Sequence, residues 1–339
     1  MKRIPVDHAV GMVLVHDVTE IVPGRFKGPA FKRGHVIRPQ DVDRLRDLGK
    51  ENIAALDLAA GWLHEDEAAQ RLAAAAAGAG IALSAPSEGK VNLIASRDGL
   101  LKIDVDRLNG INAIPDIMMA TRHTHQLVTA GQVVAGTRII PLTIQAERLQ
   151  AAEARCGPAA PVVAVKSLNP HRVGLITTGS EVYHHRIEDR FGPVVTEKIA
   201  ALGSRVLRQI CVPDDIPMTV AAIEALIAEG AQIVLITGGM SVDPDDLTPG
   251  SIRATGAEVI TYGAPVLPGA MFMLAYLDDR PVIGLPGCVM YHKSSIFDLL
   301  LPRILTGERL TREDIVVLGH GGMCLGCADC RYPSCSFGK

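Results

Sequence analysis

The sequence contains few aromatic residues, little net charge and no long apolar run, and each shortage argues against a class of protein. Aromatic residues make up only 4% of the chain, which disfavours a base-stacking surface for nucleic acid. A formal net charge of −3 gives no electrostatic reason to expect nucleic acid or an anionic membrane as a partner. No stretch approaches the roughly 18 consecutive apolar residues of a membrane span, and residues 1–7 contain no apolar signal core. We therefore expect a cytoplasmic protein with neither nucleic-acid nor membrane partners.

The composition instead favours a large folded core. The 339 residues suffice for two or three domains, and 48% hydrophobic against 21% charged residues indicates a globular chain. The seven cysteines are placed unevenly, because four fall within the last sixteen residues: Cys324, Cys327, Cys330 and Cys335. In a reducing compartment such crowding indicates metal binding before disulfide formation.

A short β-branched run, residues 233–236, leads through Thr237 into the glycine pair Gly238 and Gly239. Such a run predicts a buried central strand of a parallel sheet that ends in a tight turn. Taken alone, the pattern also fits an ordinary turn between a strand and a helix. Its significance comes from similar turns elsewhere in the chain.

Two further predicted strands, residues 172–177 and 280–285, also end in small residues. Ligands of open α/β sheets bind at the carboxyl ends of the strands, where backbone N–H groups attract anions and phosphates above all. The small residues at these ends are Thr178, Gly179 and Ser180 after the first strand, and Pro286 and Gly287 after the second. The sequence therefore predicts an anion site at one edge of a sheet.

Strands alternate with helices from residue 162 to about residue 307. The predicted strands are 172–177, 205–212, 232–237, 258–262 and 280–285, and the predicted helices are 193–202, 217–229, 249–255 and 291–305. This alternation implies right-handed crossovers and an α/β fold with a doubly wound, mostly parallel sheet. No Gly-x-Gly-x-x-Gly follows any of these strands, which argues against an NAD-type dehydrogenase.

The remainder of the chain is expected to form smaller parts. Residues 1–80 predict an α+β module, residues 81–150 a β-rich module, and residues 315–339 a cysteine-rich, metal-binding tail, with a linker at 151–161 before the α/β domain at 162–307. The strands expected in the two modules are 11–18, 31–37, 52–58, 90–95, 99–104 and 138–144, and the helices are 39–49, 64–77 and 117–129.

A polar group within the last of these helices, Arg122, His123 and His125, fits a site or a solvated face. We favour the solvated face.

Three carboxylates, Asp243, Asp245 and Asp246, follow the glycine pair closely. Carboxylates at that position suit Mg²⁺ beside a phosphate or an adenylate. They also suit capping of a helix that begins near Leu247.

Four motifs in the α/β region resemble the molybdopterin-binding domain shared by the Mog and MoaB proteins and by the MoeA and gephyrin E-domain molybdenumtransferases. They are Thr177-Thr-Gly-Ser-Glu-Val182, Thr237-Gly-Gly-Met-Ser-Val-Asp-Pro-Asp-Asp246, Leu267-Pro-Gly269 and Gly284-Leu-Pro-Gly287. The resemblance covers about residues 165–306, and residues 1–80 more loosely resemble the start of MoeA-like proteins.

The resemblance implies a molybdopterin pocket and assigns residues to it. The residues that would line the pterin and phosphate pocket are Thr178, Gly179, Ser180, Glu181 and Asp189. Those that would hold the terminal phosphate are Thr237, Gly238, Gly239 and Ser241, and Pro286 and Gly287 match the family's Leu-Pro-Gly turn. Asp246, with Asp245 beside it, matches the acidic residue that the family needs for activity, and Asp243 would join them in holding Mg²⁺.

Departures from the family leave two functions open. The Pro-x-Phe-Asp-x-Ser-Ala-Met-Asp-Gly-Tyr-Ala segment of the transferases is absent, and Cys288-Val289 replaces the usual Asn-Pro. One function is a Mg²⁺-dependent molybdopterin molybdenumtransferase acting on adenylated molybdopterin. The other is a carrier, chaperone or sensor that passes molybdopterin to a recipient molybdoenzyme. Family members are dimers or trimers, so we expect a homodimer.

The tail carries the spacing Cys-x2-Cys-x2-Cys-x4-Cys. Bacterial ferredoxins use Cys-x2-Cys-x2-Cys-x3-Cys-Pro, whereas here the last gap is longer and Pro333 precedes the final cysteine. The pattern favours an iron–sulfur cluster slightly over structural Zn²⁺. Sulfur carriage, disulfide redox chemistry and four free thiols are the other assignments.

Overall fold

The computed structural model describes residues 2–12, 14–22, 26–55, 61–157 and 161–339. The chain divides into two compact units, each assembled from segments that are discontinuous in sequence. The first unit comprises Met1–Ser96, Ile103–Arg122 and Ala130–Ala164, and the second comprises Arg97–Lys102, His123–Thr129 and Val165–Lys339.

A six-stranded sheet forms the centre of the second unit, in the order β15-β14-β16-β19-β18-β17. The strands are β14 (Arg172–Thr178), β15 (Arg205–Val212), β16 (Ile233–Thr237), β17 (Glu258–Tyr262), β18 (Met273–Leu277) and β19 (Arg280–Leu285). The first four strands in the order run parallel, whereas β18 and β17 are antiparallel to their neighbours. The carboxyl ends of β15, β14, β16 and β19 therefore meet at one edge.

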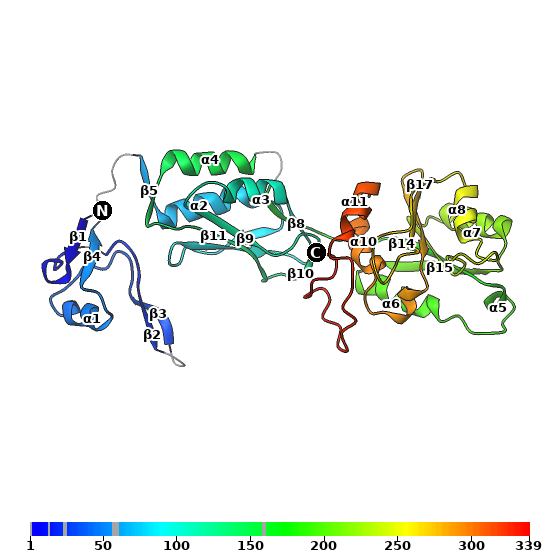
Figure 1. The fold of residues 1–339 in the computed structure, drawn as a ribbon, viewed down its shortest axis with the longest axis horizontal. Helices are drawn as coiled ribbons and strands as arrows, with labels where there is room; N and C mark the ends of the chain where they lie inside the picture. The colour runs from blue at the N-terminus through cyan, green and yellow to red at the C-terminus, as the bar shows by residue number, and fades with distance from the viewer. Residues whose placement is uncertain (1, 13, 23–25, 56–60, 158–160) are drawn as a thin grey trace. The chain divides into compact units, whose positions relative to one another are not determined.

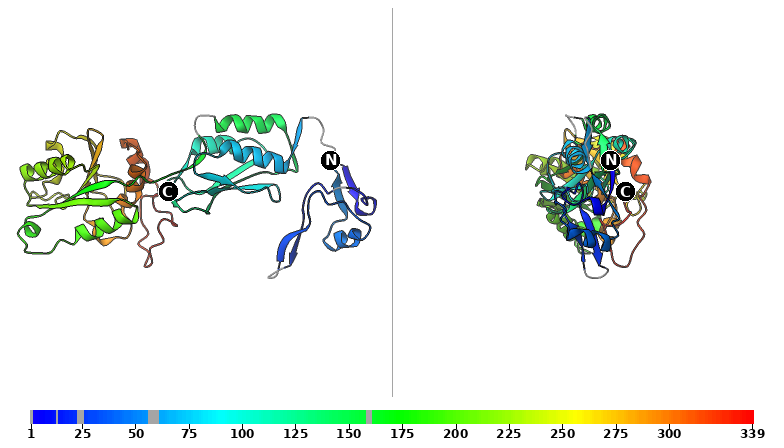
Figure 2. Two further views of the ribbon diagram at one scale, coloured as in Figure 1. Left: turned by 180° about the vertical axis from the view of Figure 1, so that it is seen from behind. Right: turned by 90° about the vertical axis from the view of Figure 1, so that its left-hand side faces the viewer.

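Helices cover both faces of this sheet (Figure 1; Figure 2 shows the same arrangement from behind). Within β16, Ile233 and Leu235 pack into the core that includes α6 (Phe191–Ala201) and α10 (Ile296–Leu305). Val234 and Ile236 pack into the opposite core, which includes α7 (Ile216–Ala228) and α8 (Thr248–Ala254). Burial on both sides explains why the strand is apolar throughout instead of alternating.

The α/β class is confirmed, and the strands expected in this region are all present. Strand β18 was not predicted, since it pairs with β17 and β19 through contacts distant in sequence. The expected helix at 291–305 is shorter, because α9 (Cys288–Tyr291) ends before α10 begins at Ile296.

The second unit also contains short elements outside the main sheet. They are α5 (Ser180–Tyr183), α11 (Arg312–Val316), the 3₁₀ helix η2 (Val317–Gly319), β8 (Gly99–Ile103) and β10 (Leu127–Val128), and β8 and β10 belong to a three-stranded sheet with β13 (Val163–Lys166). Residues 320–339 form no helix or strand and take part in one isolated bridge, between Leu267 and Met323.

The helix predicted over 117–129 is wrong. Strand β9 (Ile117–Thr121) and strand β10 occupy this stretch. Ile117 and Met119 are buried whereas Met118 is exposed, which is the two-residue period of a strand. The short apolar run did not distinguish the two periods.

The first unit contains a small amino-terminal part and a four-stranded sheet. The first part contains β1 (Lys2–Pro5), η1 (Val6–His8), β2 (Val18–Val22), β3 (Phe26–Phe31), α1 (Asp41–Asp47) and β4 (Asn52–Ala55). The sheet has the order β6-β7-β11-β9, with β6 (Ile81–Leu83), β7 (Lys90–Ala95) and β11 (Val133–Ile139). Also present are β5 (Trp62–His64), α2 (Glu65–Ala76), α3 (Val105–Asn112), β12 (Thr143–Gln145) and α4 (Ala146–Cys156). Helix α2 packs on β7, β11 and α4.

Several boundaries in the first unit differ from the sequence predictions. No strand covers residues 11–17 where they are described, since β2 begins at Val18. The strand expected at 31–37 ends at Phe31, and the one expected at 138–144 is divided between β11 and β12. The predicted strand 52–58 is present as Asn52–Ala55, and residues 56–58 lie outside the described residues.

The predicted linker at 151–161 is wrong in its first half, because α4 continues to Cys156. Leu149, Ala152 and Cys156 of α4 are buried on one face of this helix. Residues 158–160 lie outside the described residues. Across the described ranges, no helix is both long enough and apolar enough to cross a membrane.

Candidate functional site

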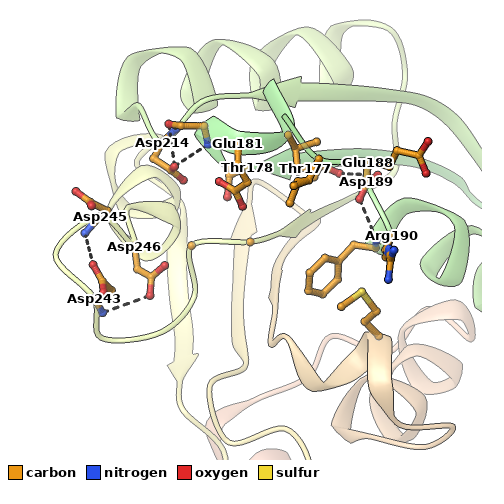
Figure 3. Close-up of a pocket in the computed structure, with 18 of the residues that line it drawn as sticks. Thr177, Thr178, Glu181, Glu188, Asp189, Arg190, Asp214, Asp243, Asp245 and Asp246 are labelled. Carbon is orange, nitrogen blue, oxygen red and sulfur yellow. Dashed lines mark hydrogen bonds between the residues drawn. The ribbon is translucent and has the colours of Figure 1, made fainter. Parts of the chain in front are cut away.

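A cleft of about 1120 Å³ lies at the carboxyl ends of β14, β15 and β16 (Figure 3). Three loops and α9 form it: the loop after β14, which continues through α5 to Asp189, the loop after β15 at Asp214, and the turn after β16, with Met290 and Tyr291 from α9. The predicted residues that line it are Thr178, Gly179, Ser180, Glu181, Asp189, Gly238, Gly239, Asp243, Asp245 and Asp246. The topology thus brings together side chains that are almost 70 positions apart (178 to 246).

A second cavity, of about 530 Å³, adjoins this cleft. The two share Phe191, Gly238, Gly239 and Asp246 as lining residues. The remaining predicted residues Ser241, Pro286 and Gly287 line this second cavity, together with the Leu267–Gly269 motif. Thr237 lines neither cavity, because it is fully buried beneath the turn.

The Gly238–Gly239 turn has positive φ angles, which residues other than glycine rarely adopt. Gly238 has a φ of +88° and Gly239 a φ of +55°. A Cβ atom on Gly238 would collide with the carbonyl oxygen of Thr178, and one on Gly239 would lie 2.9 Å from Oγ1 of Thr248. Thr248 in turn donates to the carbonyl oxygen of Gly238 at 2.9 Å. The turn is therefore held close to the end of β14.

Buried threonine hydroxyls connect the strand ends behind this turn. Oγ1 of Thr178 donates to the carbonyl oxygen of Thr237 at 3.2 Å and lies 3.3 Å from Oγ1 of Thr248. Oγ1 of Thr237 lies 3.3 Å from both the carbonyl oxygen of Ile176 and Oγ1 of Thr177. The hydroxyls of Thr178 and Thr237 therefore hold the shape of the site.

Asp189 lines the cleft and also fixes the start of α6. Its carboxylate accepts hydrogen bonds from the backbone N–H groups of Phe191 (2.9 Å) and Gly192 (3.1 Å) and from Nε2 of Gln209 (2.5 Å). A carboxylate at a helix amino terminus also interacts favourably with the helix dipole. Oγ1 of Thr177 also donates to it at 3.3 Å, so this side chain is oriented by four donors from three elements.

Asp214 is a cleft residue that the sequence reasoning missed. Its Oδ2 accepts from the backbone N–H of Ser180 at 2.9 Å and from the Ser180 hydroxyl at 3.0 Å. The signal was an acidic residue two positions after the predicted strand 205–212, at the same sheet edge as the glycine turns. Its neighbour Asp215 instead caps α7.

The three carboxylates after the glycine turn bond to their own loop. Oδ2 of Asp246 accepts from the backbone N–H of Asp243 at 3.3 Å, and Oδ1 of Asp243 accepts from that of Asp245 at 3.2 Å. Helix α8 has no side-chain cap at Leu247, so the helix-capping alternative is wrong. Asp243 and Asp245 are exposed, whereas Asp246 is half-buried between the two cavities.

The cleft is strongly acidic. Seven carboxylates line it and Arg190 is the single lysine or arginine among its described lining residues; the carboxylates are Glu181, Glu188, Asp189, Asp214, Asp243, Asp245 and Asp246. Figure 3 shows the Asp243–Asp246 loop and the Glu188–Arg190 segment on opposite sides of the space. Like charges at such spacing repel an anion, so a phosphate here requires compensating positive charge or backbone donors.

Neither predicted metal site is gathered around a single ion. In the part of the chain that the structure describes, no group of three or more His, Cys, Asp or Glu side chains is placed to hold a metal ion. This applies to Asp243, Asp245 and Asp246. Two of these carboxylates, those of Asp243 and Asp246, accept hydrogen bonds from backbone N–H groups of the same loop. It applies equally to the cysteines Cys324, Cys327, Cys330 and Cys335, all of which have free thiols.

The chain matches two protein-family models. Residues 174–306 match a probable molybdopterin binding domain, and residues 3–57 match a domain of unknown function. The first match contains the whole cleft.

Among known relatives, a molybdenum cofactor biosynthesis bifunctional protein of Synechococcus elongatus is 35% identical over 83 residues, covering 24% of this chain and 26% of that protein. A molybdopterin adenylyltransferase of Pyrococcus furiosus is 32% identical over 92 residues, covering 27% and 54%. A CinA-like protein of a Mycobacterium species is 36% identical over 91 residues, covering 26% and 21%. The chain therefore spans between about a fifth and about half of these relatives' length.

Similar solved structures include the tungsten cofactor synthesizing protein MoaB from Pyrococcus furiosus, with a TM-score of 0.34, 21% identity and coverage of 42% of this chain and 98% of that one. In the described part of this chain, the matched family and the cleft coincide at the same strand ends. Residues 174–306 are therefore similar to a probable molybdopterin binding domain, and the relatives that match this region include a protein named for molybdenum cofactor biosynthesis.

Proposed function

We propose that the cleft binds molybdopterin and that the protein acts in molybdenum cofactor biosynthesis. The observation that carries this proposal is the Gly238–Gly239 turn, which brings backbone against the end of β14 inside the matched domain. Small residues at three adjacent strand ends leave room for a phosphate to approach the backbone. The acidic side chains around them provide acceptors for a ligand rich in N–H donors, as a pterin ring is.

In this arrangement the terminal phosphate lies at the Gly238–Gly239 turn, with the Ser241 hydroxyl as a further donor. The pterin ring extends toward Asp214 and Glu181, whose carboxylates accept from its amino and ring N–H groups. Asp189 lines the same cleft with its orientation already set by backbone donors. The exposed face of the cleft admits the ligand from solvent.

The acidity of the cleft supports a divalent cation beside the phosphate. Mg²⁺ is commonly held by one or two carboxylates together with substrate phosphates, so a cage made by protein alone is not required. Asp243 and Asp246 would hold the ion, since carboxylate oxygens are its preferred ligands and both lie beside the glycine turn. When bound, it would neutralise the phosphate charge that seven neighbouring carboxylates otherwise oppose.

The position of Asp246 supports a catalytic role for its carboxylate in addition to a role in binding. It is half-buried at the junction of the two cavities, and its backbone N–H donates to the carbonyl oxygen of Asp243 at 2.9 Å, which fixes its position. In the transferase reaction, the anhydride bond between the molybdopterin phosphate and adenylate is cleaved by water, AMP leaves, and molybdate binds the dithiolene sulfurs. Asp246, with Asp245, would orient the reacting phosphate and water in that step.

The decisive experiment uses molybdopterin itself. Protein purified without oxygen is mixed with molybdopterin or its adenylated form, and bound pterin is measured as its fluorescent oxidation product. We expect about one pterin per chain, and molybdate-dependent release of AMP from the adenylated form. Asp246→Asn should keep the pterin and lose at least tenfold in turnover, whereas Asp279→Asn, an exposed acid outside the cleft, should change neither.

Each other outcome has a clear meaning. Binding without turnover in the wild-type protein would identify a carrier, chaperone or sensor that delivers molybdopterin to a recipient molybdoenzyme. Absence of binding to added molybdopterin would contradict the proposal as a whole. We also propose a homodimer, which sedimentation equilibrium of the same preparation tests directly.

A further inference from the structure

The cysteine loop, residues 321–338, is a closed and anchored segment despite its lack of regular structure. The backbone N–H of Gly338 donates to the carbonyl oxygen of Gly321 at 3.0 Å and closes it. Near its start, the N–H of Cys324 donates to the carbonyl oxygen of Leu267 at 2.8 Å. Near its end, Phe337 is only 2% exposed and packs into the core of the second unit.

A second aromatic residue supports the middle of the loop. Tyr332 packs against the same core, and its hydroxyl donates to the carbonyl oxygen of Asp298 at 3.0 Å. The rings of Tyr332 and Phe337 meet edge to face, with centroids 6.2 Å apart. These contacts anchor the middle and the end of the loop to the core.

All four cysteines of the loop line one cavity of about 310 Å³. Cys324 and Cys335 are half-buried and contact the core, whereas Cys327 and Cys330 are exposed. The opposite wall is formed by the segment Tyr291–Ser294. The Cys330 sulfur lies 3.4 Å from Oγ of Ser294, which connects the loop to that wall.

The spacing of the cysteines and their shared cavity favour one of the groups that four cysteines can bind. Within the described ranges, no three of these thiols or neighbouring His, Asp or Glu side chains are already placed around a single metal ion. The Cys-x2-Cys-x2-Cys-x4-Cys spacing is close to the ferredoxin pattern, and iron–sulfur clusters are held by four cysteine thiolates. A cavity lined by all four thiols suits such a cluster.

We propose that Cys324, Cys327, Cys330 and Cys335 bind an iron–sulfur cluster. The four cysteines would bind the irons as thiolates, each thiol giving up its proton on binding. The proposal concerns this loop alone and does not depend on which ligand the cleft binds.

The cysteine cavity adjoins the acidic cleft. Tyr291 lines both the cysteine cavity and the acidic cleft, and it is the last residue of α9. The cluster would therefore be separated from the ligand of the cleft by the segment Tyr291–Ser294. Its binding and that of the cleft ligand can be measured separately on one sample.

The experiment uses the full chain, purified without oxygen and incubated with ferrous iron and sulfide. Iron, acid-labile sulfide and zinc are measured after desalting, together with visible absorption and electron paramagnetic resonance after reduction. We expect two or four irons per chain, with as much sulfide, roughly as Cys₄ clusters hold. Cys330→Ser should lose most of the iron and the visible absorption.

A matched control separates the loop from other cysteines. Cys211 is also exposed but lies on β15, away from the cavity, so Cys211→Ser should keep the full iron content. Because Cys330 is exposed, its replacement should leave the metal-free protein folded, as thermal unfolding can verify.

Two results would overturn the proposal. One is a single zinc ion per chain with no iron, and the other is four reactive thiols with no metal after reconstitution. Molybdopterin content, measured on the same samples, has no bearing on either result, so failure of the cluster and failure of the cleft assignment remain distinguishable.

Discussion

At the scale of single residues, two glycines of the adjoining cavities differ in what a side chain would meet. Gly238 has a positive φ, and an added Cβ would collide with the backbone of β14. Gly287 has a φ of −55°, and the nearest atom to an added Cβ would be a ring carbon of Phe191, at 3.9 Å. We expect Gly238→Ala to lower the free energy of unfolding by about 1–3 kcal/mol, and Gly287→Ala by less than about 0.5 kcal/mol.

Urea unfolding followed by circular dichroism measures both variants. Gly238→Ala should also lose molybdopterin affinity by at least tenfold, because any relief of the collision moves the turn at which we propose that the phosphate binds. Equal stability of the two alanine variants would show that the turn can relax at little cost. Equal stability would therefore contradict the prediction that the collision at Gly238 keeps the turn rigid.

At the scale of elements, the junction between β15 and α7 contains two neighbouring acids with different partners. Asp215 caps α7 by accepting from the N–H of Met218 at 2.8 Å, whereas Asp214 accepts from Ser180 within the cleft. Asp215→Ala should lower stability by about 0.5–2 kcal/mol, as loss of a cap does, and leave pterin binding intact. Asp214→Ala should weaken pterin binding more than Asp215→Ala does.

Calorimetric titration with molybdopterin, beside thermal unfolding, measures these two effects. The pair is well matched because the changed side chains are identical and adjacent. If Asp215→Ala reduced binding as much as Asp214→Ala, the cleft would depend on the whole helix and not on the Asp214–Ser180 contact.

Elements were predictable from sequence where local pattern and burial agree. The run 233–236 indicated β16 because residues buried on both faces leave a continuous apolar signature. The position of the glycine turn, Asp243 and Asp246 at the cleft was predictable because they follow that strand closely in sequence. Strand β18 was missed, since only its pairing with two distant strands makes it a strand. Asp214 was missed because its role depends on Ser180, 34 positions earlier in the chain.

At the scale of the whole molecule, the second unit is assembled from segments that sequence proximity does not reveal. Lys102, from the segment Arg97–Lys102, forms an ion pair of 2.7 Å with Glu308. Glu308 also pairs with Arg303, which is 6% exposed and whose guanidinium contacts Asp314. Breaking such a buried network leaves charges without partners, which is costly. No local pattern connects residue 102 to residue 308, so this part of the fold could not be predicted.

His125 belongs to the same network. The prediction that it lies on a solvated face is therefore wrong. Arg122 and His123 are exposed, but His125 is half-buried and its Nε2 lies 2.7 Å from Nζ of Lys102. Lysine can only donate, so Nε2 must accept and the ring must be neutral at that atom. Burial, with the positive charges of Arg303 and Lys102, lowers the pKa of His125 to about 4.

This shifted pKa predicts how the stability of the second unit depends on pH. An unfolded histidine titrates near its ordinary pKa of roughly 6.5, so between that pH and about 4 the unfolded chain binds more protons than the folded one. The free energy of unfolding should therefore fall as the pH decreases through this window, by up to about 3 kcal/mol. Burial alone would raise the pKa of Glu308 and Asp314. Contacts with Lys102 and Arg303 lower the pKa of Glu308, and hydrogen bonds from Arg303 and Thr311 lower that of Asp314, so a further loss of stability follows only at more acidic pH.

Urea unfolding at pH 7, 5.5 and 4.5 should show this decrease in the wild-type protein. His125→Asn removes the titrating ring, and asparagine tolerates the positive φ of 63° at this position. The variant should be less stable at pH 7, because Lys102 loses one acceptor, yet its stability should change much less between pH 7 and 4.5. Parallel pH profiles for the two proteins would mean that the buried histidine does not control this transition. In that case, carboxylates elsewhere in the chain would account for the loss of stability in acid.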